Sequence, residues 1–286
     1  MFKIKRHYEV LGKVTYADDA NYPDIIDMKD QKYHNNWIDD DMLHYKDFYY
    51  QYAGLSDLSR HLDKMFYEQD TDMALCAVPY HKWGDIEKLK SMAAIPALAM
   101  NPAHTFSKIP DNWEREQKAI LLMAKCEKIA LGPLYCDAFL PDMEKQEAQL
   151  ATQLKTAVVY GVPVVLGANE AWDHVLKVLN NTPAKPKTMI VLPDTLNREQ
   201  AAALLKEPTV HMAFSSLITS DKQKALRDVL YMTPIEKIVL SSHGLLHREE
   251  DTTFVGTTRF MGKRIGYNAR PIRKAISTNS QKLLED

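Results

Sequence analysis

The stretch KIALGPLYCDAFLPDMEKQEAQLATQLKTAVVYGVPVVLGAN, residues 128–169, decides the fold class. It contains an apolar run at 128–137, a helical pattern at 142–161 that ends at Gly161, and a second apolar run at 162–169. Near-continuous apolar strands that alternate with helices indicate a parallel sheet whose outer face is covered by the helices. The stretch therefore predicts one strand–helix–strand unit of an α/β protein.

Similar units recur along the chain. Helical patterns at 56–69, 197–207 and 221–231 follow apolar runs or precede them. With the two runs above, the apolar runs number eight, which is the strand count of a closed (β/α)₈ barrel of the TIM type. The six further runs are 22–27, 72–80, 93–102, 187–194, 209–216 and 236–244.

Two segments exceed a minimal barrel. Residues 1–21 form a short N-terminal extension, and residues 31–55 make a long connection, rich in Asp and Tyr, between the first strand at 22–27 and its helix. A loop of that length is often a lid or a binding surface. We predict a single barrel domain over residues 1–286 that carries both additions.

Composition names no partner. The chain has 36 Lys plus Arg and 38 Asp plus Glu, with 45% hydrophobic residues, as in an ordinary globular protein. No run reaches the roughly 20 apolar residues that a membrane helix needs, and the N-terminal sequence has no secretory apolar region, so we expect a cytoplasmic protein. The three cysteines are too few for a disulfide framework or a four-thiolate zinc site.

Several segments occur in an order and spacing that match a known family. They are IPALAMNPAH (95–104), the stretch 128–169, TVHMAFSSLIT (209–219), MGKR (261–264) and STNSQKLL (277–284). From about residue 23 to residue 284, the chain resembles the TatD family of metal-dependent hydrolases. The resemblance implies a barrel whose relatives hydrolyse DNA or other phosphodiesters with bound metal ions.

The resemblance also implies a metal site built from a His-x-His pair on the first strand, Glu on the fourth, His on the fifth and sixth, and Asp on the eighth. Such ligands hold a cation that lowers the pKa of a bound water. Most residues at the matching positions offer no metal-binding side chain, so we predict a non-catalytic binding or interaction protein without a cofactor. The matching residues are Lys29, Gln31, Pro133, Gly167, Leu192 and His243.

A relocated metal site remains open, because five histidines fall in predicted loops. A divalent ion such as Mg²⁺, Mn²⁺ or Zn²⁺ there would make the chain a divergent hydrolase of phosphodiesters or amides. Only His243 and His247 have a His-x-x-x-His spacing, and the five include no His-x-His pair. Five of the ten histidines in the loops of one half of the molecule is close to chance, so the non-catalytic interpretation is favoured. They are His34, His81, His104, His243 and His247.

Other polar residues are candidates for chemistry or binding. Lys29 could pair with Asp137 or Asp194 in place of the missing metal charge, or act as the Schiff-base lysine of a lyase-type enzyme. The basic segment 259–274 suits a phosphate backbone, although the acidic HREED just before it favours a solvated loop. We expect a protein or small-molecule partner, with nucleic acid less favoured. The catalytic candidates are Lys29, Asp194 and His243, and the ligand-binding candidates are Gln31, Asn101, Asn169, Arg259, Lys263 and Arg264.

Overall fold

The strands that the structure describes build one parallel sheet. The computed structural model describes residues 45–47, 50–51, 54–56, 58–59, 62, 71–92, 94–100, 112–123, 128–242, 257–258, 260–261 and 269–283. The sheet has the strand order β2-β4-β5-β6-β7-β8-β9-β10-β1-β3. The strands are β1 (Tyr45–Asp47), β2 (Tyr50–Gln51), β3 (Thr71–Met73), β4 (Cys76–Pro79), β5 (Pro96–Ala99), β6 (Ala130–Asp137), β7 (Val164–Asn169), β8 (Met189–Val191), β9 (Val210–Phe214) and β10 (Ile238–Leu240).

The sheet closes into a ring. One chain segment contains β1 and β2, the next contains β3 and β4, and these two segments pair with each other at both ends of the strand order. Strands β3 and β4 are separated only by Ala74 and Leu75, and β1 and β2 are also close in sequence. The pair β1–β3 ends the order on one side, while the pair β2–β4 ends it on the other. Strand β1 also pairs in parallel with β10, with Asp47 opposite Leu240. The predicted TIM-type barrel is therefore confirmed, with eight strand positions around the ring.

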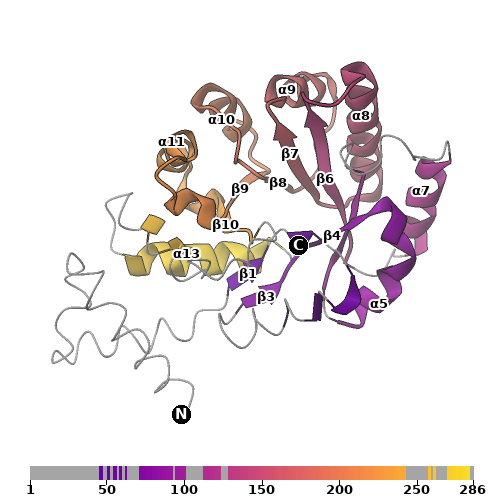
Figure 1. The fold of residues 1–286 in the computed structure, drawn as a ribbon, viewed down its shortest axis with the longest axis horizontal. Helices are drawn as coiled ribbons and strands as arrows, with labels where there is room; N and C mark the ends of the chain where they lie inside the picture. Colours follow the sequence, from indigo (N-terminus) through magenta and orange to yellow (C-terminus); the bar gives the residue numbers. More distant parts are fainter. Residues whose placement is uncertain are drawn as a thin grey trace, which may run out of the picture. The chain divides into compact units, whose positions relative to one another are not determined.

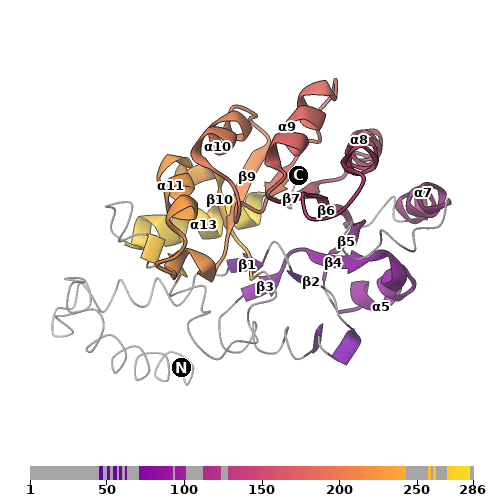
Figure 2. The ribbon, with the colours of Figure 1, turned by 45° about the horizontal axis from the view of Figure 1, so that its top comes forward.

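Helices follow the strands and cover the outside of the sheet. Figure 1 shows α8 and α9 beside β6 and β7, and Figure 2 shows α7 to α11 along the outer side of the strands. The α-helices are α5 (Ile86–Lys90), α7 (Trp113–Met123), α8 (Met143–Tyr160), α9 (Trp172–Asn181), α10 (Arg198–Leu205), α11 (Lys224–Met232) and α13 (Ala269–Lys282). Short 3₁₀ helices are η1 (Tyr80–Asp85), η2 (Ser216–Thr219) and η3 (Ile235–Lys237).

Local sequence signals set the helix ends. Helix α8 stops at Gly161, which adopts φ 66°, a conformation that glycine enters without steric cost. Helix α10 begins with a capping box in which Asn197 and Gln200 exchange hydrogen bonds. The predictions of helices at 142–161, 197–207 and 221–231 are confirmed, each within a few residues. No helix in the described part of the chain is long and apolar enough to cross a membrane.

The interior of the barrel is filled by small and branched apolar side chains from successive strands. The set includes Ala97, Ala130, Val165, Ile190, Ala213 and Val239, all essentially inaccessible to solvent. Because side chains alternate along a strand, this layer also identifies which later residues of each strand face inward. Burial of this layer supplies the main favourable free energy of the fold.

The beginning of the barrel differs from the sequence prediction. The predicted loop 31–55 contains β1 and β2, so that prediction is wrong over residues 45–47 and 50–51. Aromatic residues such as Tyr45 and Tyr50 favour strands, but the segment has no apolar run to reveal them. The predicted first strand, 22–27, lies outside the described residues, and the place beside β10 is taken by β1.

Candidate functional site

The carboxyl-terminal ends of the neighbouring parallel strands β6, β7 and β8 lie side by side at one end of the barrel, which we call the mouth. Val165 and Ile190 belong to the interior layer, so alternation directs Gly167 and Asn169 on β7, and Leu192 after β8, to the same side. In a (β/α)₈ barrel this carboxyl-terminal face carries the functional groups. The candidate site therefore lies among the residues at these three strand ends.

Strand β6 reaches the mouth through an irregular step. Leu131 pairs with Val164 and Leu134 pairs with Leu166, so β6 contains one more residue than β7 over this interval. Pro133 lies inside the irregularity, a place where a strand tolerates the missing amide of proline. The extra residue sets the register beyond it, in which Tyr135 stands opposite Gly167.

The ring of Tyr135 lies directly over Gly167. A Cβ atom at Gly167 would lie 2.6 Å from Cε2 and 2.7 Å from Cδ2 of Tyr135, which is closer than real side-chain contacts, and 3.6 Å from Cδ1 of Leu192. Glycine is therefore required at position 167 while the ring is in place. Tyr135 and Leu192 thus occupy the space next to Gly167 at the mouth of the barrel.

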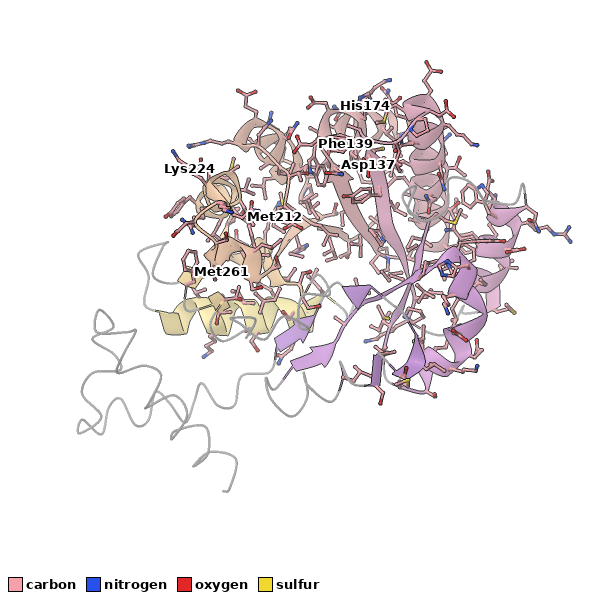
Figure 3. The ribbon with its side chains drawn as sticks, in the orientation of Figure 1. Asp137, Phe139, His174, Met212, Lys224 and Met261 are labelled. Carbon is pink, nitrogen blue, oxygen red and sulfur yellow. The ribbon has the colours of Figure 1, made fainter. Side chains whose placement is uncertain are left out.

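Asp137 stands at the end of β6, next to this ring. Asp137 is 7% exposed, and its Oδ1 accepts a hydrogen bond of 2.8 Å from the backbone N–H of Phe139. The Asn169 Nδ2 donates to both carboxylate oxygens at 3.4 Å and 3.5 Å. Figure 3 shows Asp137 and Phe139 together at the end of the strand. These contacts keep the carboxylate at the mouth.

Two carboxylates act on the Tyr135 phenol. Burial raises the pKa of Tyr135 to about 12, and the negative charges of Asp137 and Asp194 add to the effect. The phenol is therefore neutral over the physiological range, where it can donate a hydrogen bond. The mouth combines an uncharged tyrosine with two acidic side chains.

A buried glutamine holds the loop that follows β6. The Gln146 Oε1 accepts from the backbone N–H of Asp137 at 2.8 Å, and its Nε2 donates to the carbonyls of Asp137 and Pro141, both at 3.1 Å. This loop carries Phe139, which is 75% exposed. Gln146 thus fixes an exposed phenyl ring beside the acidic mouth.

A second chain of hydrogen bonds holds the segment after β8. The Trp172 Nε1 donates to the Thr195 hydroxyl at 3.1 Å, and that hydroxyl donates to the carbonyl of Ala168 at 2.9 Å. Thr195 follows Asp194 directly, so the bonds tie this aspartate to the end of β7. Helix α9 and strands β7 and β8 together position the second carboxylate.

The structure brings only some of the predicted site residues together. Asn169 contacts Asp137, and Asp194 acts on the same tyrosine as Asp137, so these two candidates share one site. His81 is exposed within η1. The remaining candidates lie outside the described residues and stay predictions: Lys29, Gln31, His34, Asn101, His104, His243, His247, Arg259, Lys263 and Arg264.

Sequence reasoning did not single out Tyr135. The available signal was Gly167, because a glycine within a strand marks a close approach of another group. In the family pattern, however, this glycine signifies only a residue without a metal-binding side chain. Its partner could not be identified from local sequence, because the partner depends on the register between β6 and β7.

Three described residues on β6, on β7 and after β8 offer no side-chain ligand to a metal ion. Pro133, Gly167 and Leu192 stand where the resemblance implies a carboxylate and two imidazoles, and none has a side-chain donor. A cation there would meet the ring of Tyr135 and the apolar Leu192 side chain. Among the residues that the structure describes, no three His, Cys, Asp or Glu side chains form a group that could hold a metal.

Comparison with known proteins gives a consistent picture. A family model described as TatD related DNase matches residues 44–285. No curated protein matches the chain. Because the match begins at residue 44, the expected start near residue 23 is wrong, and Lys29 and Gln31 precede the matched region. The first described strand of that region is β1, which ends at Asp47.

Solved structures share the fold at low identity. The TatD homologue YjjV from Escherichia coli superposes with a TM-score of 0.71 at 18% identity, covering 85% of this chain and 98% of its own. A TatD family hydrolase from Entamoeba histolytica gives 0.62 at 10% identity, covering 84% and 97%. An uncharacterized amidohydrolase from Saccharomyces cerevisiae gives 0.59 at 11% identity, covering 84% and 99%. These likenesses concern the fold alone.

Proposed function

The chain belongs to the TatD related DNase family, and we propose that this member keeps the barrel without a working metal centre and acts as a non-catalytic binding protein. The observation that carries the proposal is the packing of the Tyr135 ring over Gly167, with the Leu192 side chain next to the same position. A metal-bound water becomes a nucleophile at neutral pH only when several ligands hold the cation. Pro133, Gly167 and Leu192 cannot supply those ligands.

The rim of the mouth is the surface that a partner would contact. Its polar groups are the partly exposed Asn169 and Asp194, the neutral Tyr135 phenol and the largely buried Asp137, with the exposed ring of Phe139 beside them. Two carboxylates repel a phosphate backbone, so a protein or small-molecule partner in the cytoplasm is favoured over nucleic acid. Aromatic side chains such as Phe139 are common anchors of protein interfaces.

Metal analysis of the purified full-length chain, followed by a nuclease assay with added Mg²⁺ or Mn²⁺, tests the proposal. We expect no stoichiometric metal and no cleavage of DNA above a buffer control, while a commercial metal-dependent nuclease is active in the same buffers. Stoichiometric metal together with activity that His243→Ala abolishes would overturn the proposal. That outcome would favour the divergent hydrolase with a relocated site, for which we would next replace His81.

The rim can be tested once a partner co-purifies with the full-length chain. Phe139→Ala should weaken binding of that partner by about tenfold or more if the ring is an anchor. Leu122→Ala is the matched control, because Leu122 is also an exposed apolar residue, 58% exposed, but lies on α7. Equal loss in both variants would argue against contact at the rim.

A further inference from the structure

We propose that Tyr135 itself excludes a metal ion from the barrel mouth, so that the site is closed by packing in addition to lacking ligands. This inference rests on the proposed function and identifies the side chain that occupies the site. It predicts that restoring ligands alone does not restore metal binding. Removing the ring must accompany any restored ligand.

The register of the strands makes the ring and the ligand positions neighbours. Tyr135 pairs with Gly167 across β6 and β7, and the backbone N–H of Leu192 donates to the carbonyl of Leu166 at 2.8 Å. Positions 167 and 192 therefore lie side by side beneath the tyrosine ring. The distances from a Cβ atom placed at position 167 to Tyr135 and Leu192 put all three residues in one packed group.

A side chain at position 167 has no room while the ring is present. Even a methyl group would overlap Cε2 and Cδ2 of Tyr135, at 2.6 Å and 2.7 Å. An imidazole is far larger, so Gly167→His must displace the ring or distort β7. Overpacking of this kind is destabilising in cores.

Without the ring, the same backbone would bring four potential ligands together. Adjacent parallel strands are about 4.8 Å apart, which lets imidazoles at positions 167 and 192 share one cation. The carboxylates of Asp137 and Asp194 lie close enough to Tyr135 to act on its phenol, and they would face the vacated space. Imidazole and carboxylate ligands suit Zn²⁺ and Co²⁺.

Cobalt binding by two full-length variants tests the inference. One combines Gly167→His and Leu192→His with Tyr135 retained, and the other adds Tyr135→Ala. We expect the second to bind about one Co²⁺ per chain, with the visible absorption of a coordinated ion, and the first to bind none. Tyr135→Ala/Gly167→Ala/Leu192→Ala is the matched control, because it opens the same space without imidazoles.

Stability measurements keep the inference testable if a histidine variant does not fold. Gly167→Ala should lower the melting temperature by about 4 to 8 °C when Tyr135 is present, because the added methyl overlaps the ring. In the Tyr135→Ala background the same change should cost little. Tyr135→Phe should behave like the native residue, because the ring and not the hydroxyl fills the space.

Two results would overturn the inference. Equal cobalt binding with and without Tyr135 would show that the ring is no barrier. An equal cost of Gly167→Ala in both backgrounds would show that residues 135 and 167 do not compete for space. Neither result depends on the metal content or nuclease activity of the native chain, so failure here is distinguishable from failure of the non-catalytic proposal.

Discussion

Individual residues at the mouth have structural tasks that limit what the site can do. Tyr135 fills space that only Gly167 leaves open, while Gln146 holds the loop that carries Phe139. Asp137 is held at the rim because a backbone N–H and the Asn169 amide donate hydrogen bonds to its carboxylate. The chemistry that is left is hydrogen bonding and negative charge, which suits binding.

Replacing Gln146 tests how the rim is held. Gln146→Ala leaves the buried backbone groups of Asp137 and Pro141 without the partners described above, which should lower the free energy of unfolding by about 2 to 3 kcal/mol. Denaturant unfolding of the variant and the native chain measures the difference. Gln149→Ala on the same helix is the control, because the Gln149 Nε2 has no hydrogen-bond partner among the described residues. Equal losses would mean that the hydrogen bonds of Gln146 add nothing.

His211 on β9 predicts a pH dependence of stability. Burial lowers its pKa, the backbone at Thr209 partly opposes this, and the charge of Lys237 adds to the lowering. His211 therefore binds a proton less readily in the folded chain than in the unfolded chain. Stability from this group is present above the ordinary histidine pKa and is lost as the pH falls below it, by at most about 1.4 kcal/mol per pH unit.

Thermal melting between pH 7.5 and pH 5.5 checks this sign. His211→Gln should lose less stability over that interval than the native chain, because glutamine does not titrate. His81→Gln, which changes an exposed histidine, should follow the native curve. A His211→Gln curve that coincides with the native one would refute the assignment to His211.

At the scale of elements, the apolar runs identified most of the barrel. Runs such as 128–137 and 162–169 became β6 and β7, because a strand covered on both faces must be apolar throughout. Strands β1 and β2 escaped prediction, since they span only three and two residues and mix Tyr with Lys, Asp and Gln. Their pairing is imposed by neighbouring strands, which local hydrophobic patterning cannot reveal.

The same limit applied to the candidate site. That Pro133, Gly167 and Leu192 carry no metal-binding side chain could be seen from the sequence. The group that fills their place could not, because Tyr135 reaches Gly167 through a register that the extra residue of β6 determines. Contacts between strands about 30 residues apart require the fold first.

The Asn279 side chain joins helix α13 to the start of β10 by hydrogen bonds, which gives an element-scale prediction. The Asn279 Nδ2 donates to the carbonyls of Ile235 and Ile238 at 2.8 Å and 2.9 Å. Asn279→Ala should lower the free energy of unfolding by about 1 to 3 kcal/mol, because it leaves two carbonyls near the start of β10 without this donor. Gln281→Ala, an exposed change on the same helix, should have little effect in the same denaturant titration. Similar losses in both variants would show that Asn279 does not anchor the helix.

At the scale of the whole molecule, ring closure determines which part of the chain the barrel needs. Strand β1 pairs with both β10 and β3, so the ring closes without any strand before Tyr45. The described residues all belong to one unit, Tyr45–Asp286, and the family match starts at residue 44. The barrel therefore does not require the predicted strand at 22–27.

Truncation provides the corresponding test. A chain that begins at residue 44 should unfold cooperatively, with a melting temperature close to that of the full chain. It retains all ten strands, β1 through β10, and every pairing among them. A chain that begins at residue 53 lacks β1 and β2 and should lose cooperative unfolding, because β10 and β3 then lack the strand between them. Circular dichroism melting of the three chains distinguishes the outcomes. If the chain from residue 44 failed to fold, a strand before Tyr45 would have to belong to the ring, and Lys29 and Gln31 would again be candidates for its mouth.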